Sequence, residues 1–296
     1  MSTLLRKVIY CLIGLLAGMA AWSVSELILT RQSVFPSYLV FSIVIGGAFG
    51  LTMGGFFGSS EGITLSIQPK ILTGIATGMI VGVFGGTFGF LFGQGLLFLI
   101  GEMILYSNKM IHTIGVPVSR AMGWGIVGVF VGAGEGFRSL SWTKIKVGIA
   151  GGLIGGIIGG LTLEFIQIYF PHSFLSRFIG LMVLGSLIGL FYGFVETGFS
   201  QGVLKVLNGT LKGKEYLILK RKIRIGSASK ADIQLVGYAD VASVHALIFR
   251  KGKEIFVKQD SETAEILVND TRVIQRQLEF EDVLQVGSVK FLFYYQ

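Results

Sequence analysis

Charged residues are scarce in this chain, and that scarcity restricts what the protein can be. Asp, Glu, Lys and Arg make up 14% of the 296 residues, whereas hydrophobic residues make up 52%. A composition this apolar excludes an ordinary soluble protein. The chain has a single cysteine, Cys11, which lies inside the first apolar run, so no disulfide framework can form within one chain.

Motifs that carry enzymatic chemistry are also missing. The chain has three histidines, and no Cys/His spacing typical of a metal site, no nucleophile elbow and no phosphate-binding P-loop occurs. We therefore predict no catalytic residue, no metal site, no cofactor and no enzymatic activity. The net charge is +8, but no basic stripe with interleaved aromatic residues is present, so we expect no nucleic-acid partner.

The few charges are unevenly distributed. Residues 1–202 contain ten Lys/Arg and six Glu, whereas residues 203–296 contain fifteen Lys/Arg and eleven Asp/Glu. Apolar runs of 18 or more residues are long enough to cross a membrane as helices. We therefore predict a glycine-rich transmembrane domain at residues 1–203 and a soluble domain at residues 204–296.

Six apolar runs predict six membrane-spanning helices. They lie at about 6–29, 38–58, 70–103, 120–137, 145–169 and 177–200. An even number places both termini on one side. With the termini inside, the inner segments carry seven Lys/Arg against four in the outer segments, and this bias favours a membrane protein with both termini in the cytoplasm.

A motif with fixed spacing occurs three times in the membrane domain. In each copy a Lys follows a Glu by nine residues and a Gly follows it by thirteen: Glu61–Lys70–Gly74, Glu135–Lys144–Gly148 and Glu196–Lys205–Gly209. This repetition predicts three helical hairpins at about 1–65, 66–140 and 141–205. Glycines also recur every four residues along the helices, which favours a tight helix bundle over a conducting pathway.

All six acids of the membrane domain fit this scheme. We expect three near the outer helix ends and three at the inner turns: Glu26, Glu102 and Glu164 outside, and Glu61, Glu135 and Glu196 inside. The inner acids can pair with the Lys of the next helix and stabilise each turn. A ring of three carboxylates that binds a cation is the alternative.

From about residue 204 the pattern changes to many short strands separated by Gly, Asn and Asp turns, which predicts a β-sandwich. The order of motifs resembles the forkhead-associated (FHA) domain: "IG" at 225–226, "DIQL" at 232–235, "VASVHALI" at 241–248, "DSETAEILVND" at 260–270 and "LEFEDVLQVGSVKFLF" at 278–293. The resemblance covers residues 204–296 and implies an all-β domain that binds proteins.

FHA domains typically bind phosphothreonine peptides, yet the positions that the resemblance assigns to phosphate and peptide contacts are altered. Ser227 replaces an Arg, Ala242 replaces a Ser, Ser243 replaces a second Arg and Ala264 aligns with the usual Asn. His245 is retained and supports the loop in the family. Since a dianion needs charge-assisted donors, we expect binding that does not depend on phosphorylation. The remaining residues of this loop region are Ser229 and Lys230, which are possible substitute donors, and Asn269.

The whole arrangement is similar to a family of bacterial membrane proteins in which glycine-rich helical hairpins with a Glu at each turn lead into an FHA domain. We therefore expect a membrane protein, in contact with lipid, that presents an FHA-type module to a protein partner as a scaffold or signalling adaptor. The alternative is a transporter or channel subunit regulated by its FHA domain. The sequence leaves a homo-oligomer open.

Overall fold

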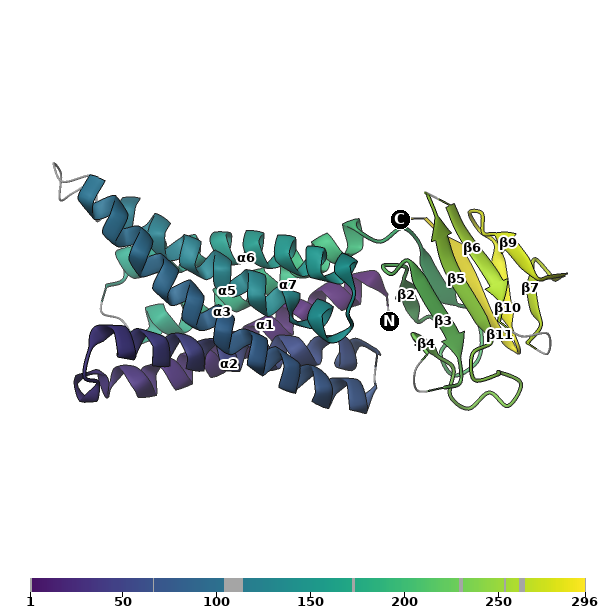
Figure 1. The fold of residues 1–296 in the computed structure, drawn as a ribbon, viewed down its shortest axis with the longest axis horizontal. Coiled ribbons are helices and arrows are strands. Elements are labelled where there is room, and N and C mark those ends of the chain that lie inside the picture. The colour runs from purple at the N-terminus through teal and green to yellow at the C-terminus, as the bar shows by residue number, and fades with distance from the viewer. Residues whose placement is uncertain are drawn as a thin grey trace. The chain divides into compact units, whose positions relative to one another are not determined.

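A computed structural model describes residues 2–65, 67–103, 114–171, 174–228, 231–252, 254–260 and 264–295, with the side chains of residues 101–103 excepted. The chain forms two compact units. One comprises residues 4–196, and the other comprises residues 197–296 together with the amino-terminal three residues. The first unit is helical and the second is built of strands (Figure 1). Each unit is described by itself below.

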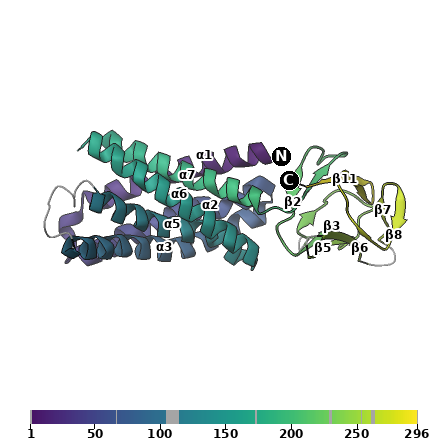
Figure 2. The same cartoon turned by 90° about the horizontal axis from the view of Figure 1, so that it is seen from above.

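Six long helices lie side by side in the described part of the first unit (Figures 1 and 2). They are α1 (Thr3–Leu29), α2 (Tyr38–Leu65), α3 (Gln68–Met103), α5 (Val116–Arg138), α6 (Trp142–Tyr169) and α7 (Phe174–Gly198), and a short 3₁₀ helix, η1 (Gln32–Val34), follows α1. All six are long and apolar enough to cross a membrane. The prediction of a six-helix transmembrane bundle is therefore confirmed.

Glycines set the distance between three pairs of helices. A β-carbon added to Gly54 of α2 would lie 2.0 Å from the carbonyl oxygen of Gly78 in α3. Gly128 of α5 meets the Gly152 oxygen of α6 in the same way at 2.1 Å, and Gly14 of α1 meets the Gly185 oxygen of α7 at 2.0 Å. Only a residue without a side chain permits such close backbone contact.

These contacts connect different helices from those that the predicted hairpins group together. The sequence groups α1 with α2, α3 with α5 and α6 with α7, whereas the closest glycine-to-glycine contacts join α2 to α3, α5 to α6 and α7 to α1; a wider contact, from Gly89 to the Gly123 oxygen at 2.7 Å, joins α3 to α5. Each of these three pairs thus links the second helix of one predicted hairpin to the first helix of another. The third pair brings the first and last helices of the bundle together.

Apolar side chains fill the centre of the bundle and also cover its outside. Phe49, Met53 and Ile188 belong to a buried cluster to which several helices contribute. Leu12 and Leu16 of α1 are about half exposed, as are many large apolar residues on the other helices. Outward apolar side chains of this kind suit a lipid environment.

Two sheets form the second unit. Their strands are β1 (Val203–Val206), β2 (Glu215–Leu217), β3 (Lys222–Gly226), β4 (Ile233–Gln234), β5 (Ala246–Lys251), β6 (Glu254–Gln259), β7 (Ile266–Val268), β8 (Thr271–Val273), β9 (Gln275–Gln277), β10 (Val283–Val286) and β11 (Val289–Tyr294). One sheet has the order β2-β1-β11-β10-β7-β8 and the other β4-β3-β5-β6-β9. The only parallel pair within these sheets is β3 with β4.

Alternation of apolar and polar residues explains why these segments become half-buried strands. Val289, Phe291 and Phe293 of β11 are fully buried, whereas the residues between them are partly exposed. Ile223 and Ile225 of β3 alternate in the same way. A period of two residues turns one side of each strand toward the core, so the predicted β-sandwich is confirmed.

Candidate functional site

Loops meet at one end of the sandwich, where the FHA resemblance places its binding region. The loop after β3 joins the loop before β5 through two backbone hydrogen bonds: Ser227 N–H donates to Ala242 O at 3.0 Å, and Ala228 N–H donates to Ser243 O at 3.1 Å. A β-carbon on Gly226 would lie 2.2 Å from the Ser243 oxygen, so this position requires glycine for the two loops to approach.

His245 connects these loops to the segment before β7. Its side chain is buried, and its Nδ1 accepts a hydrogen bond from the Ala242 N–H at 3.2 Å. Its Nε2 lies 2.8 Å from the carbonyl oxygen of Glu265. A neutral imidazole protonated at Nε2 satisfies both contacts, because Nδ1 then accepts and Nε2 donates. With this geometry His245 acts as a cross-link inside the loop end and has no free nitrogen for a ligand.

Among the described residues, the exposed surface of the loop end offers little to bind a phosphate. Ser243 is exposed, whereas Ala264 is fully buried beneath the surface. Arg272 of β8 is exposed, but its guanidinium pairs with the Glu265 carboxylate at 2.8 Å. A phosphate that approached Arg272 would have to compete with this carboxylate. Charge-assisted donors must be available to offset the desolvation of a dianion.

One residue that the sequence assigns to the binding loops, Asn269, lies away from them. Asn269 follows β7 at the end of that strand opposite to Glu265, and its φ is +53°. Its side chain donates to Asp282 at 2.6 Å and accepts the Val283 N–H at 2.9 Å. Asn269 therefore stabilises the far end of the sandwich. Two further predicted residues, Ser229 and Lys230, lie outside the described residues.

Two of the inner acids of the membrane domain share their cations. Lys144 of α6 is hydrogen-bonded to Glu61 of α2 and lies 3.6 Å from Glu135 of α5. Arg138 donates to both oxygens of Glu135, at 2.5 and 2.9 Å, and its Nη2 lies 3.8 Å from Glu61. The four side chains are 5–15% exposed. Acids from two of the predicted repeats thus meet in one buried cluster.

The third inner acid has a separate partner. Arg6 of α1 donates to Glu196 of α7 at 2.8 Å, and the Tyr10 hydroxyl lies 3.4 Å from the same carboxylate oxygen. Glu196 is 2% exposed, and its other oxygen, Oε2, has no hydrogen-bond partner among the described residues. Because each inner acid lies beside a cation, these contacts indicate charge neutralisation within the bundle.

The outer acids also form ion pairs across helices. Glu26 of α1 accepts two hydrogen bonds from Arg177 of α7, at 2.7 and 3.1 Å. Glu164 of α6 accepts one from Arg120 of α5 at 3.0 Å. Glu102 lies in α3, but its side chain is outside the described part of the structure. Sequence reasoning missed the four arginines that pair with these acids and with the inner ones.

The position of these arginines in the sequence could have identified them as partners of the acids. Each lies within about two helical turns of an end of its helix, as the six acids do: Arg6, Arg120, Arg138 and Arg177. The repeated motif instead predicted that each inner Glu pairs with the Lys nine residues later. Lys144 does approach Glu135, but its hydrogen bond goes to Glu61, which lies in another of the predicted repeats. In the parts of the chain that the structure describes, no group of three or more His, Cys, Asp or Glu could hold a metal ion.

Comparison with known proteins gives a match for the second unit. Residues 205–296 match the family model described as "Inner membrane component of T3SS, cytoplasmic domain". No match to this chain was found among curated proteins. The prediction of an FHA-like, all-β domain at the carboxyl end of a multi-span membrane protein is confirmed.

Solved FHA domains are similar to the same part of the chain. One, from a study of phosphothreonine-dependent FHA domain interactions, is 22% identical with a TM-score of 0.30, and the match covers 32% of this chain and 96% of that one. The FHA domain of CT664 from Chlamydia trachomatis is 23% identical with a TM-score of 0.30, and the match covers 32% of this chain and 97% of that one.

Proposed function

We propose that this chain is a membrane-anchored protein-interaction module of the bacterial inner membrane, which acts as a scaffold or signalling adaptor and has no catalytic activity. The family match supports it, because the matched model describes the cytoplasmic domain of an inner membrane component. Six helices suited to a membrane precede that domain. Both termini then lie in the cytoplasm, and the loop end of the sandwich receives a protein partner.

Binding at the loop end is independent of phosphothreonine in this proposal. The side chains at the loop end support this mode of binding. Both ring nitrogens of His245 are hydrogen-bonded within the loops, Ala264 is buried, and Arg272 is paired with Glu265. Ser227 and Ser243 stand where the family has arginines. A neutral or basic protein surface fits this mixture of small polar residues and one acid better than a phosphate does.

A capture experiment tests the proposal. The intact protein, tagged and taken from its own membranes, should retain a protein partner that a chain lacking residues 204–296 does not retain. Phosphatase treatment of the membranes should leave the capture unchanged. Micromolar binding to a phosphothreonine peptide that is lost on dephosphorylation would overturn the phosphate-independent mode.

Matched charge reversals locate the binding surface. Glu265→Lys changes the loop end, whereas Glu254→Lys changes another exposed residue, which begins β6 in the other sheet, at the end of that strand away from the loop end. Since surface ion pairs contribute about 0–1 kcal/mol, both variants should fold. Capture should fall for Glu265→Lys alone; an equal loss with both variants would place the partner elsewhere.

The three inner acids have a structural role in this proposal. Glu61, Glu135 and Glu196 hold the inner ends of the helices together through their cations, in place of a ring of carboxylates that binds a metal ion. The support is the neutralisation of each acid by Lys144, Arg138 or Arg6. A cation added to such a cluster would first have to displace a positive side chain.

A further inference from the structure

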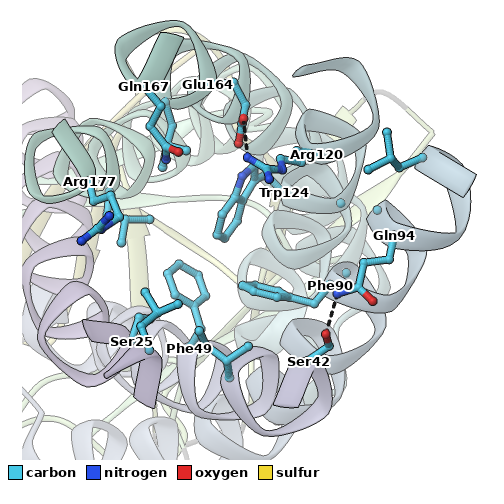
Figure 3. A pocket seen from close by; sticks show the side chains of 18 of the residues that line it. Ser25, Ser42, Phe49, Phe90, Gln94, Arg120, Trp124, Glu164, Gln167 and Arg177 are labelled. Atoms are coloured by element: carbon cyan, nitrogen blue, oxygen red, sulfur yellow. Dashed lines mark hydrogen bonds and ion pairs between the residues drawn. The ribbon is translucent and has the colours of Figure 1, made fainter. Parts of the chain in front are cut away.

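A cavity of about 300 Å³ lies in the helical unit among the outer ends of its helices (Figure 3). All six helices contribute to its lining, from Ser25 of α1 to Leu181 of α7. The proposed protein-binding function makes no use of it. A cavity of this size can accept a small organic molecule of roughly 10–20 non-hydrogen atoms.

Aromatic rings form one wall of the cavity. The side chains of Phe49, Phe90 and Trp124 point toward one another in Figure 3. The ring centroids of Phe49 and Trp124 are 5.0 Å apart, and those of Phe90 and Trp124 are 5.3 Å apart. Aliphatic residues such as Ile45 and Leu163 extend this surface. The wall therefore suits the apolar part of a ligand.

A cation lies beside this aromatic wall. Arg120 reaches the rim from α5, and its ion pair with Glu164 uses one terminal nitrogen, Nη1. About half of the Arg120 side chain, 52%, remains exposed. The guanidinium therefore keeps N–H groups that can donate to a second anion. Glu164 is almost buried and is already paired, so it is poorly placed to attract a cation.

A buried hydroxyl supplies an independent sign of a ligand. Ser25 lines the cavity and is 8% exposed, and its Oγ has no hydrogen-bond partner among the described residues. An unpaired buried hydroxyl costs free energy that a ligand can recover. Ser25 lies on a different side of the cavity from Arg120 (Figure 3), so two polar groups of one ligand can be held at once.

We propose that this cavity binds a small anionic amphiphile. Its carboxylate or phosphate group accepts hydrogen bonds from Arg120, its apolar body packs on Phe49, Phe90 and Trp124, and a second polar group reaches Ser25. The ligand comes from one of two sources with the same chemistry: an anionic lipid of the bilayer or a free amphiphilic acid.

Trp124 can report on occupancy directly. The full chain is placed in nanodiscs of phosphatidylcholine with Trp22→Phe and Trp142→Phe, which leaves Trp124 as the only tryptophan. Titration with 6-bromohexanoate should quench its fluorescence saturably, and unbrominated hexanoate should reverse the quenching. The neutral analogue 6-bromohexanol should bind about tenfold more weakly, because a charge-assisted hydrogen bond is lost.

Variants separate the two halves of the site. Arg120→Gln should remove the preference for the acid over the alcohol, whereas Arg31→Gln, an exposed arginine just after α1, should keep it. Because Arg120→Gln leaves Glu164 without its partner, Ser25→Leu provides a second test that preserves the ion pair. A leucine there removes the hydroxyl and occupies part of the cavity, so saturable quenching by both compounds should weaken.

Nanodisc composition distinguishes the sources of the ligand. If phosphatidylglycerol at one lipid in five displaces 6-bromohexanoate from the parent protein, the occupant is a membrane lipid; if it does not, the occupant is a free acid. Quenching that rises linearly, resists displacement by hexanoate, or is unchanged in both Arg120→Gln and Ser25→Leu would overturn the proposal. None of these readouts depends on the partner of the sandwich domain.

Discussion

Replacing Lys144 by Met tests how the inner ends of the helices are held together. Lys144 is 10% exposed, is hydrogen-bonded to Glu61, and lies 3.6 Å from Glu135. Methionine has nearly the same length and suits the helix, so the substitution removes the charge and leaves most of the packing. Among the described ion pairs, Arg138 is then the one remaining cation that lies beside both Glu61 and Glu135.

The expected effect follows from burial. Removing one partner of a buried ion pair costs about 3–5 kcal/mol, because the remaining charge stays away from water without compensation. For a unit of this size each kcal/mol corresponds to about 2–4 °C in melting temperature. Lys144→Met should therefore lower the melting temperature of the protein in detergent by roughly 10 °C.

The assay is thermal unfolding of the purified protein, with Lys146→Met as the matched control. Lys146 lies two residues further along α6 and is exposed, so its loss should change the melting temperature by about 1–2 °C at most. The double variant Glu61→Gln/Lys144→Met should recover part of the loss, since coupled residues interact by about 0.5–3 kcal/mol. Equal melting temperatures for Lys144→Met, Lys146→Met and the parent protein would refute the reasoning.

Three further predictions test other parts of the protein. Gly54→Leu should abolish monodisperse protein in size-exclusion chromatography, because a β-carbon added to Gly54 would lie 2.0 Å from the backbone of α3. Gly95→Leu should be tolerated, since nothing lies within 4 Å of a β-carbon added there. His245→Ala should destabilise the sandwich by about 1–3 kcal/mol through its two lost hydrogen bonds, as measured by denaturant unfolding followed in the intact chain. On a Cys11→Ser background, Lys251→Cys should react with an impermeant maleimide only after the inner membrane is opened; labelling in intact spheroplasts would contradict a cytoplasmic domain.

Hydrophobic patterning was sufficient to predict the elements of this protein. The predicted third span, 70–103, corresponds to α3 at Gln68–Met103, and the sixth, 177–200, corresponds to α7 at Phe174–Gly198. Long apolar runs specify helices because a buried backbone in lipid must satisfy its own hydrogen bonds. Strand alternation is equally local, as in β3, where the buried Ile223 and Ile225 alternate with exposed residues.

Side-chain partners could not be predicted in the same way, because they depend on which helices become neighbours. Glu135 and Lys144 are nine residues apart and do approach each other, as the turn spacing suggests, but Glu61 receives its hydrogen bond from Lys144, 83 residues away. Asn269 illustrates the same limit in the sandwich. Its place in the motif order suggested the binding loops, whereas the direction of β7 carries it to the other end.

The contact between α1 and α7 shows why it matters that the close glycine pairs join helices of different predicted hairpins. If each predicted hairpin packed mainly within itself, α1 and α7 would have no reason to meet. Instead their backbones touch at Gly14 and Gly185, and at one end of the same helix pair Arg6 reaches Glu196, 190 residues away along the chain. Close packing and charge pairing therefore require the same neighbour for α1. Since α7 supplies both contacts, the first helix of the unit is held in place by the last one.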